Sequence, residues 1–421
     1  MEHKGTEGLR TWVEIDTGLL RQNFLRLQKL IGPRCRFMAV VKSNAYGHGL
    51  VPVAKQLANA KHEAINPKSL WFGVDSVVEA LRLREEGIKN PVLVFGSTLA
   101  ERMHEAADNH ITLTISNFDA LASLSKLSER PEFHLKIDTG MHRQGFMPGD
   151  TARLVKCLKR SGLSPAGIYT HFAAAKDRAY PTITFRQFKN FNDVLGKLKR
   201  VGFSAKGAVP AGPRGSSPVG RHGVSGGKNF IRHAAASGGT ILFPETHLDM
   251  VRVGMALWGH WPSEEARLNV VSRMFDLPSL ELRPILSWKT RIAEIKEIPA
   301  GASIGYDLTE RVTRKSAVAV LPVGYWHGLD RGLSSIGSVL VRGGRAKILG
   351  RVSMDMIVVD ITDINNKVKS QKLKVKTGEE VVLIGKQGQV EVTAEEMARL
   401  IGTSPYEVLT RINPLIERIY R

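Results

Sequence analysis

The sequence predicts a (β/α)8 barrel of the TIM type followed by a mainly β domain. Three observations predict this α/β fold class. Short apolar runs alternate with segments of helical length, the later part of the chain changes to strands separated by glycine-containing turns, and 421 residues exceed one ordinary domain. We therefore expect the barrel at residues 10–281 and the β domain at residues 282–421.

A helix is predicted ahead of the first barrel strand. Its apolar residues recur three or four positions apart and so share one face: Leu20, Phe24, Leu27 and Ile31. Either Asp16 or Thr17 can cap its start, and Gly32 with Pro33 can end it.

The eight predicted barrel strands are short and apolar, as expected of strands covered on both faces. They lie at Phe37–Val41, Leu70–Val74, Val92–Phe95, Ile111–Ile115, Phe133–Ile137, Ala166–Thr170, Phe230–Ala236 and Met250–Met255. Segments between them, such as Ser76–Glu86 and Thr151–Lys159, have helical length and amphipathic patterns. This alternation is typical of parallel strands joined by helical crossovers.

Residues 204–228 differ in composition from the barrel around them. They hold seven Gly, three Pro, four Ser and four basic residues, with no acidic residue. Such a segment buries too little apolar surface to order itself, so we expect a flexible surface insertion. A basic binding arm is the alternative.

The β domain is predicted from a change of pattern after Arg283. Its expected strands are Leu286–Ile295, Ala317–Leu321, Ser338–Val341, Met356–Ile361 and Glu380–Ile384. The first long helix of this domain is expected at Thr393–Leu400, where Thr393 and Glu396 form a capping box.

Composition excludes several classes of protein. The net charge of +20 is compatible with nucleic-acid binding, but the charges are spread along the chain without a nucleic-acid motif, so we expect no such partner. No apolar stretch approaches the roughly 20 residues that cross a membrane, and residues 1–10 lack a secretion signal. Two cysteines, Cys35 and Cys157, form neither a disulfide framework nor a metal pair, which favours a cytoplasmic protein without a metal.

Reactive side chains follow several predicted strands, where the active site of a barrel forms. These residues are Lys42, Arg143, His171, Ser237 and Arg252, with Gly254 just beyond. Each has a structural alternative: a solvated lysine, a hydrogen-bonded histidine, or an Arg252 that pairs with Asp249 or Glu245. Their convergence on one face of one barrel favours an active site.

Four segments make the resemblance to a known family specific. Val40–Gly49 (VVKSNAYGHG) closely resembles the pyridoxal phosphate attachment motif of alanine racemases, and Asp138–Phe146 resembles a second motif. Pro322–Tyr325 and Gly350–Met356 resemble further signatures. The resemblance spans essentially the whole chain. It implies a pyridoxal 5'-phosphate barrel with a β domain, a head-to-tail homodimer, and interconversion of L- and D-alanine that supplies peptidoglycan synthesis.

The resemblance implies two catalytic bases. Lys42 would hold the cofactor as a Schiff base until substrate displaces it, and would then act as a base beside Cα. Tyr306 would approach the opposite face from the partner subunit, supported by His171 and Arg252. Arg252 would also face the pyridine nitrogen. Because an arginine can only donate, the nitrogen would stay unprotonated, which should suppress transamination.

The resemblance also implies the binding residues. The expected phosphate contacts are Tyr46, Ser237, Tyr406 and the amides of Gly254 and Met255. Arg143 and the Met354 amide match positions that take the substrate carboxylate.

Supporting residues complete the predicted site. Lys136 matches a lysine that is carbamylated in some family members and orients the arginine. Tyr325 and Asp355 lie in the motifs of the β domain, and Asp355 has the alternative of capping a turn.

Departures from the family pattern leave the substrate range open. Ala236 replaces an asparagine that commonly precedes the phosphate-binding serine, Trp326 and His327 replace residues near the site entrance, and Asp307 gives Tyr306 an unusual context. One alternative is a broader racemase that accepts serine or basic amino acids. Another is a pyridoxal phosphate carrier without turnover, but such barrels lack the β domain. Related decarboxylases usually place an acidic residue at the pyridine nitrogen.

Overall fold

The computed structural model describes residues 5–59, 69–205, 229–366 and 374–421. The chain divides into two compact units. Residues 21–42 and 54–283 form the barrel unit, whereas residues 1–20, 43–53 and 284–421 form the β unit. Most of the predicted insertion, residues 206–228, lies outside the described residues.

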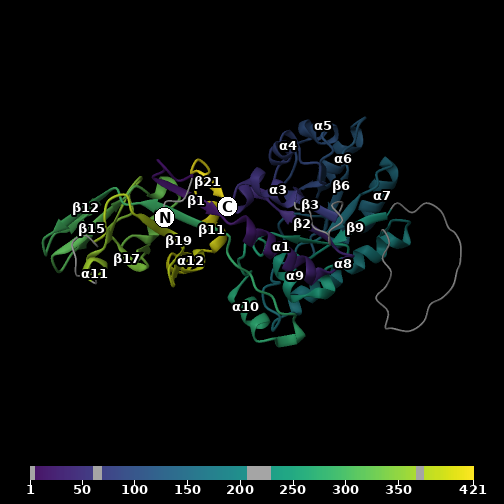
Figure 1. Ribbon diagram of the computed structural model, residues 1–421. Coiled ribbons are helices and arrows are strands. Elements are labelled where there is room, and N and C mark those ends of the chain that lie inside the picture. The colour runs from purple at the N-terminus through teal and green to yellow at the C-terminus, as the bar shows by residue number, and fades with distance from the viewer. Residues whose placement is uncertain (1–4, 60–68, 206–228, 367–373) are drawn as a thin grey trace. The chain divides into compact units, whose positions relative to one another are not determined.

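The barrel unit contains eight parallel strands in the described part of the chain (Figure 1). In ring order they are β10 (Met250–Val253), β2 (Arg36–Val40), β3 (Leu70–Val74), β4 (Val92–Val94), β5 (Thr112–Ile115), β6 (Phe133–Lys136), β7 (Gly167–Tyr169) and β9 (Asn229–His233). A short strand, β8 (Ser204–Ala205), lies beside β9. Each strand falls on one of the eight predicted runs, so the predicted barrel is confirmed.

Backbone hydrogen bonds nearly close the barrel between its first and last strands. Asp249 N donates to Arg232 O at 3.1 Å, and Arg252 N donates to Ala235 O at 2.9 Å. The Asp249 carboxylate also accepts two hydrogen bonds from the Arg232 guanidinium, both at 2.9 Å. These contacts place the ends of β10 and β9 side by side.

Helices surround the strands of the barrel unit in Figure 1. They are α3 (Leu50–Asn59), α4 (Val77–Glu85), α5 (Met103–Asp108), α6 (Phe118–Lys126), α7 (Thr151–Ser161), α8 (Thr182–Arg200), α9 (Ser237–Leu242) and α10 (Glu264–Val271). Side chains cap several of them. Ser76 accepts a hydrogen bond from Glu79 N at the start of α4, and Asn117 accepts one from Ala120 N at the start of α6.

Helix α1 (Thr17–Ile31) confirms the predicted leading helix. The Asp16 carboxylate caps it by accepting a hydrogen bond from Leu19 N at 2.7 Å, whereas the Thr17 hydroxyl donates to Arg421 O. Its predicted apolar face is buried, and Gly32 ends it with a φ of 74°.

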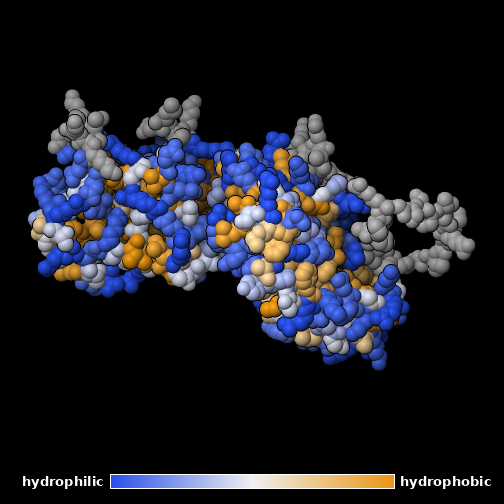
Figure 2. Space-filling model, turned by 90° about the horizontal axis from the view of Figure 1, so that it is seen from below, coloured by the Kyte–Doolittle hydropathy of each residue, from blue (hydrophilic) through white to orange (hydrophobic). Residues whose placement is uncertain are grey.

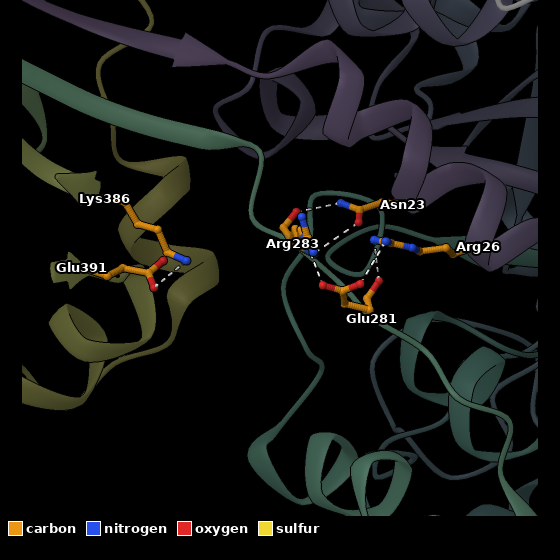
Figure 3. Close-up of polar contacts among 6 residues, drawn as sticks. All are labelled: Asn23, Arg26, Glu281, Arg283, Lys386 and Glu391. Carbon is orange, nitrogen blue, oxygen red and sulfur yellow. Dashed lines mark hydrogen bonds and ion pairs between the residues drawn. The ribbon is translucent and has the colours of Figure 1, made fainter. Parts of the chain in front are cut away.

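A polar cluster anchors the last residues of the barrel unit to α1 (Figure 3). Asn23 donates to Arg283 O at 2.8 Å and accepts from Arg283 N at 3.2 Å. Glu281 pairs with Arg26 at 3.0 Å and with Arg283 at 2.6 Å. The same view includes a separate ion pair of the β unit, between Lys386 and Glu391 at 3.6 Å.

The β unit is built on one large sheet. Its strands, in spatial order, are β12 (Glu294–Ile298), β15 (Ser316–Leu321), β18 (Ile357–Asp360), β17 (Gly344–Leu349), β16 (Ser338–Val341), β19 (Glu380–Gln387), β11 (Leu286–Arg291), β1 (Thr11–Ile15) and β21 (Arg418–Tyr420). Strand β20 (Val390–Val392) pairs with β19, and β13 (Ser303–Ile304) pairs with β14 (Glu310–Arg311). The helices are α11 (Thr362–Asn366), α12 (Ala394–Leu400) and α13 (Pro405–Thr410). Thr393 caps α12, which is half of the predicted capping box, whereas the Glu396 carboxylate pairs with Arg345.

The predicted strand Leu286–Ile295 is two strands. Strand β11 pairs with β1 and β19, whereas β12 pairs with β15. The pairing partner changes between two adjacent residues: Ile292 N donates to Glu379 O, whereas Ala293 N donates to Val320 O. Only Ile292 and Ala293 separate the two strands, and neither is a typical turn residue, so the sequence does not show the change of partner.

Strand β1, which the apolar pattern does not predict, brings the first strand of the chain beside the last one. It pairs antiparallel with β11 and parallel with β21. Buried Lys289 bridges Glu14 at 3.0 Å and Glu380 at 3.1 Å. Burial alone would raise the pKa of Glu14, but Trp12, Lys289 and Arg421 lower it by a larger amount. The pKa is therefore below its usual value, and the carboxylate stays charged in the sheet.

Hydrophilic residues cover most of the face shown in Figure 2. In the described ranges no helix is both long and apolar enough to cross a membrane. The same ranges contain no group of three His, Cys, Asp or Glu residues arranged to hold a metal ion.

Candidate active site

Lys42 lies at the carboxyl end of β2, at the mouth formed by the ends of the barrel strands. Val41 N still donates to Gly73 O of the neighbouring strand at 2.8 Å, so the strand pairing continues almost to Lys42. The Lys42 amine forms an ion pair with Asp75, with 3.4 Å between Nζ and Oδ1. Its side chain is 35% exposed, so a small molecule can reach the amine.

A left-handed turn follows Lys42. Ser43, Asn44, Ala45 and Tyr46 have φ angles of 55°, 55°, 51° and 55° within the segment α2 (Lys42–Tyr46). Residues other than glycine resist this conformation by roughly 1 kcal/mol or more each. Asn44 supports the turn, because its carbonyl accepts from Gly49 N at 2.9 Å and its side chain accepts from Leu50 N at 3.0 Å.

Two glycines of the same motif are required for space. A Cβ at Gly47 would lie 2.3 Å from the Leu409 carbonyl oxygen, and a Cβ at Gly49 would lie 1.8 Å from the Tyr420 hydroxyl. Within the β unit the turn also brings Tyr46 beside Tyr406, with 6.2 Å between ring centroids. Two of the predicted phosphate contacts therefore lie together.

Ser237 and Gly254 meet at the barrel mouth. The Ser237 hydroxyl oxygen accepts from Gly254 N at 3.1 Å and from Ala256 N at 3.4 Å. The Met255 amide, between these two, stays a predicted phosphate contact. Because the Ser237 oxygen accepts from these two N–H groups, its hydroxyl hydrogen is left as a donor, which suits a phosphate dianion.

Arg252 is buried at the end of β10, and in the part of the chain that the structure describes it does not pair with a carboxylate. It donates to His233 Nδ1 at 2.9 Å, Thr170 O at 2.8 Å and Ala234 O at 2.9 Å. The structural alternative is wrong, because Asp249 pairs with Arg232 and Glu245 pairs with Arg178. Burial lowers the pKa of Arg252 to about 10, so near neutral pH it keeps its charge.

A fourth acceptor of Arg252 is His171, with 3.3 Å between Nη2 and the histidine Nδ1. Burial, with further contributions from Arg252 and Lys136, lowers the pKa of His171 to about 3. His171 is therefore neutral near pH 7. The structure thus brings two of the predicted residues into direct contact.

Two further histidines extend this network into the barrel. Because Arg252 can only donate, His233 accepts at Nδ1 and carries its proton on Nε2, which lies 2.8 Å from His134 Nδ1. Burial, followed by the charge of Arg252, lowers the pKa of His134 to about 3 and that of His233 well below its usual value. Sequence reasoning assigned neither histidine a role.

The Tyr169 ring lies between these groups. It stacks on His233 with 4.7 Å between centroids and 7° between planes. The Arg252 guanidinium carbon lies 5.1 Å from the ring centroid, and Lys136 Nζ lies 5.7 Å from it. The aromatic face thus stabilises two buried cations. An inward-facing tyrosine within a strand gives no sequence signal of this role.

Lys136 is buried at the end of β6 and donates to Gln144 Oε1 at 3.0 Å. Burial, together with Arg143 and Arg252, lowers the pKa of Lys136 to about 8. A substantial fraction of the amine is therefore neutral slightly above physiological pH.

A tight loop carries Arg143. The Asp138 carboxylate accepts hydrogen bonds from the backbone N–H groups of residues 140–143 at 2.9 to 3.0 Å. Burial would raise the pKa of Asp138, but these four donors lower it below its usual value. A Cβ at Gly145 would lie 2.6 Å from Asp138 N. The loop is therefore rigid, and it holds Arg143 exposed at the mouth.

The predicted residues of the β unit occupy neighbouring loops. Tyr325 N donates to Ser353 O and Trp326 N donates to Met354 O, both at 3.0 Å. Met354 and Asp355 are exposed. Tyr306 is 70% exposed, and Asp307 beside it pairs with Arg351 at 2.7 Å.

Comparison with known proteins identifies the family. A model described as the N-terminal domain of alanine racemase matches residues 9–210, and one described as the C-terminal domain matches residues 285–420. The alanine racemase of Leptospira interrogans is 34% identical over 411 residues, which cover 97% of this chain and 95% of the relative. Alanine racemase 1 of Caldanaerobacter subterraneus is 36% identical over 423 residues, covering 98% and 96%.

Solved structures agree with these relatives. The alanine racemase of Clostridium difficile 630 superposes with a TM-score of 0.81 at 30% identity, covering 98% of this chain and 96% of that one. The enzyme of Bacillus anthracis, solved with bound L-Ala-P, superposes with a TM-score of 0.80 at 31% identity, covering 98% and 95%. The barrel, the four motifs and these relatives together show that the chain belongs to the alanine racemase family of isomerases.

Proposed function

We propose that this family member interconverts L- and D-alanine with pyridoxal 5'-phosphate held on Lys42, using Lys42 and Tyr306 as bases on opposite faces of the substrate. The observation that carries the proposal is the barrel mouth, where the accessible Lys42 amine lies near Lys136, His171 and Arg252, and where the Ser237 hydroxyl follows another strand end. A solved relative with bound L-Ala-P supports alanine as the substrate. The expected product use is peptidoglycan synthesis.

The residues present fit the cofactor. The Ser237 hydroxyl and the amide of Gly254 would bind its phosphate, and Tyr46 and Tyr406 stay predicted phosphate donors. When bound, the cofactor supplies an electron sink for the carbanion at Cα. Arg252 would donate to the pyridine nitrogen, and among the described residues its own partners are histidines and carbonyl groups rather than carboxylates.

Proton transfer would be carried out by the chain's own side chains. Lys42, once displaced from the cofactor, would remove or return the α-proton on one face, and Tyr306 would do so on the other. Arg143, with the Met354 amide, would hold the substrate carboxylate and so fix which hydrogen faces which base. Lys136 would support Arg143, and Tyr325 and Asp355 would shape the entrance.

A homodimer is part of this proposal. Exposed apolar residues gather on the β-unit loops that carry the predicted site residues: Tyr306, Leu308, Tyr325, Trp326, Met354 and Met356. Such residues favour a protein partner, and a second copy would place Tyr306 in its neighbour's site. We also retain a cytoplasmic location and the division into a cofactor domain (10–281) and a β domain (282–421).

The dimer can be tested at Leu308, which is 69% exposed. We expect Leu308→Asp to weaken self-association at least about tenfold, because a carboxylate would have to be buried in the interface. Sedimentation over a concentration series measures this. Leu415→Asp, at a residue 81% exposed in the same unit, is the matched control. Equal dissociation constants for both variants contradict the proposed interface.

One experiment tests the cofactor assignment. Purified protein incubated with pyridoxal phosphate should be yellow, and borohydride should abolish the visible band while fixing the cofactor mass on the peptide that contains Lys42. Lys42→Ala should stay colourless, whereas Lys189→Ala, at an exposed lysine of α8, should not. Wild-type protein that stays colourless contradicts the assignment.

A second experiment tests the substrate. A panel of L-amino acids incubated with the yellow protein and resolved by chiral chromatography should show D-alanine as the main product. Comparable conversion of serine or a basic amino acid would instead support the broader racemase, for which Trp326 and His327 are the residues to change first.

A further inference from the structure

Lys42 has an acidic neighbour, Asp75, that belongs to none of the four motifs. Strands β2 and β3 are parallel neighbours in which Val40 lies opposite Gly73. The same register, continued by two residues, places Lys42 beside Asp75 at the barrel mouth. Residues paired across neighbouring strands point to the same face, and the two side chains meet with 3.4 Å between Nζ and Oδ1.

The backbone of Asp75 is fixed on both sides. Its N–H donates to the Glu79 carboxylate at 2.7 Å, and its carbonyl accepts from Gly96 N at 2.9 Å. A Cβ at Gly96 would lie 2.4 Å from the Asp75 carbonyl oxygen, so only glycine permits this approach. Because Ser76 then caps helix α4, the Asp75 carboxylate is presented to Lys42 from a rigid turn.

The other charged groups near Lys42 are mostly positive. Lys42, Arg143 and Arg252 all contribute to lowering the pKa values of Lys136 and His171. The nearby Asp138 carboxylate is occupied by four backbone N–H groups. Within the described residues, Asp75 is therefore the carboxylate that pairs with the Lys42 amine.

We propose that Asp75 is a positioning residue, the counter-ion on which the Lys42 amine rests whenever that amine is not joined to a carbonyl group. The inference builds on the proposed function in that Lys42 is the cofactor lysine. Capture of an aldehyde requires the ammonium to leave Asp75 and give a proton to solvent. The neutral amine then forms a C=N bond, and the carbonyl oxygen departs as water. The ion pair therefore holds Lys42 at the mouth and slows its reaction with aldehydes.

The test uses cofactor-free full-length protein and a simple aldehyde as the probe. Limiting formaldehyde with cyanoborohydride methylates lysines, and peptide mass spectrometry gives the rate at Lys42. Ion pairs at exposed sites are weak, so Asp75→Asn should raise the Lys42 rate by about two- to fivefold. Asp75→Glu, which keeps the carboxylate, should restore most of the wild-type rate.

A matched control uses another exposed ion pair of the barrel unit, Lys189 with Asp193 at 2.8 Å. Asp193→Asn should raise the rate at Lys189 and leave the rate at Lys42 unchanged. The difference between wild type and Asp75→Asn at Lys42 should also shrink in about 1 M salt, where the screening length falls to about 3 Å. A purely structural role of Asp75 predicts no such salt dependence.

An unchanged Lys42 rate in Asp75→Asn, or an increase that persists undiminished in high salt, overturns the proposal. Failure of the proposed function has a different signature. If pyridoxal phosphate produces no visible band with the wild-type protein, Lys42 is not the cofactor lysine, while the methylation rates still measure the ion pair independently.

Discussion

The Arg252 guanidinium holds a fixed positive charge within the barrel mouth. Its hydrogen bonds to His233 and His171 assign the proton positions of both rings, since an arginine can only donate. His134 extends the hydrogen-bonded chain by one residue, because its Nδ1 accepts a hydrogen bond from the proton that His233 carries on Nε2. The network therefore combines one permanent cation with neutral histidines, and any anionic or electron-rich ring nitrogen placed beside Arg252 meets a donor and no acceptor.

Arg252→Lys should destabilise the cofactor-free protein by about 1–3 kcal/mol. One ammonium cannot reproduce the planar set of bonds to His233, Thr170 and Ala234, so at least one buried acceptor loses its donor. Urea unfolding measures the change. The control is Arg178→Lys, which disturbs a pair with Glu245 nearer the surface and should lower stability by less than about 1 kcal/mol. Equal losses of unfolding free energy in the two variants would show that the Arg252 hydrogen bonds stabilise the fold no more than the Arg178–Glu245 pair does.

Tyr306→Phe should separate the two faces of the substrate. Racemisation has an equilibrium constant of one, so its kcat/KM must fall equally in both directions. Exchange of the α-proton with D2O is the informative measurement. Loss of one base should slow exchange from one enantiomer by at least about 100-fold and affect the other far less.

Tyr180→Phe, at an exposed tyrosine, is the control for Tyr306→Phe. It should leave the rates of α-proton exchange from both enantiomers unchanged. Equal slowing of both enantiomers in Tyr306→Phe would remove the two-base assignment.

Sequence reasoning located the candidate site where a chemical group follows a strand end. Lys42, His171, Ser237 and Arg252 were found in this way, and the structure groups them at one mouth. Asp75 also follows a strand, but a lone aspartate before a helix cap is typical of an ordinary turn. His134 and Tyr169 lie within strands, where a single sequence does not show which groups meet across the barrel interior.

Among the structural elements, the left-handed turn after Lys42 could not be predicted from the preferences of its own residues. Four consecutive residues with positive φ depend on contacts from distant segments, among them the close approach of Leu409 to Gly47 and of Tyr420 to Gly49. Propensities describe neighbours in the chain, so they do not predict a turn held by residues more than 350 positions away.

Gly47→Ala should destabilise the protein by more than about 2 kcal/mol, because its Cβ would lie 2.3 Å from Leu409 O and the backbone must also keep a positive φ. Gly388→Ala is the control. That glycine has a φ of 65° with no atom within 4 Å of the added Cβ, so it reports the backbone cost alone, about 1 kcal/mol. Thermal unfolding compares the two, and a Gly47→Ala loss no larger than the control contradicts the steric argument.

Barrel strands were predictable because each is a compact apolar run between helical segments. The strands of the β unit were harder to predict. Strand β11 passes into β12 without an intervening Gly or Pro, although the pairing partner changes at Ile292 and Ala293. Strand β1 is buried through Trp12, Val13 and Ile15, but the segment is short and its partner is far along the chain. The sequence therefore predicts strands better than it predicts which of them pair.

For the whole molecule, the buried neutral histidines predict a dependence of stability on pH. His134 has its pKa lowered from 6.5 to about 3 in the folded state, so below pH 6.5 the unfolded chain binds a proton that the folded chain does not. The stabilisation is complete above pH 6.5 and is lost as the pH falls toward 3. At pH 5 the loss is roughly 2 kcal/mol for each such histidine.

His134→Gln should reduce the change in unfolding free energy between pH 7.5 and pH 5 by roughly that 2 kcal/mol. Urea titrations at the two pH values measure it. His104→Gln, at an exposed residue of α5, should leave the change as it is in the wild type. A pH dependence that is identical in all three proteins would mean that His134 is not buried in its neutral form.

The sheet of the β unit has a consequence for biosynthesis. Thr11 of β1 contacts Lys289 of β11 across 278 residues, and Thr17 contacts Arg421 across 404. A ribosome makes β1 long before either partner, so this apolar strand has to wait, unpaired, while the whole barrel sequence emerges. Most barrel strands find a neighbour soon after synthesis, although β2 also needs β10 to close the ring, and the β unit can close only later still. Chaperone demand should therefore arise in part from strand β1 (Thr11–Ile15).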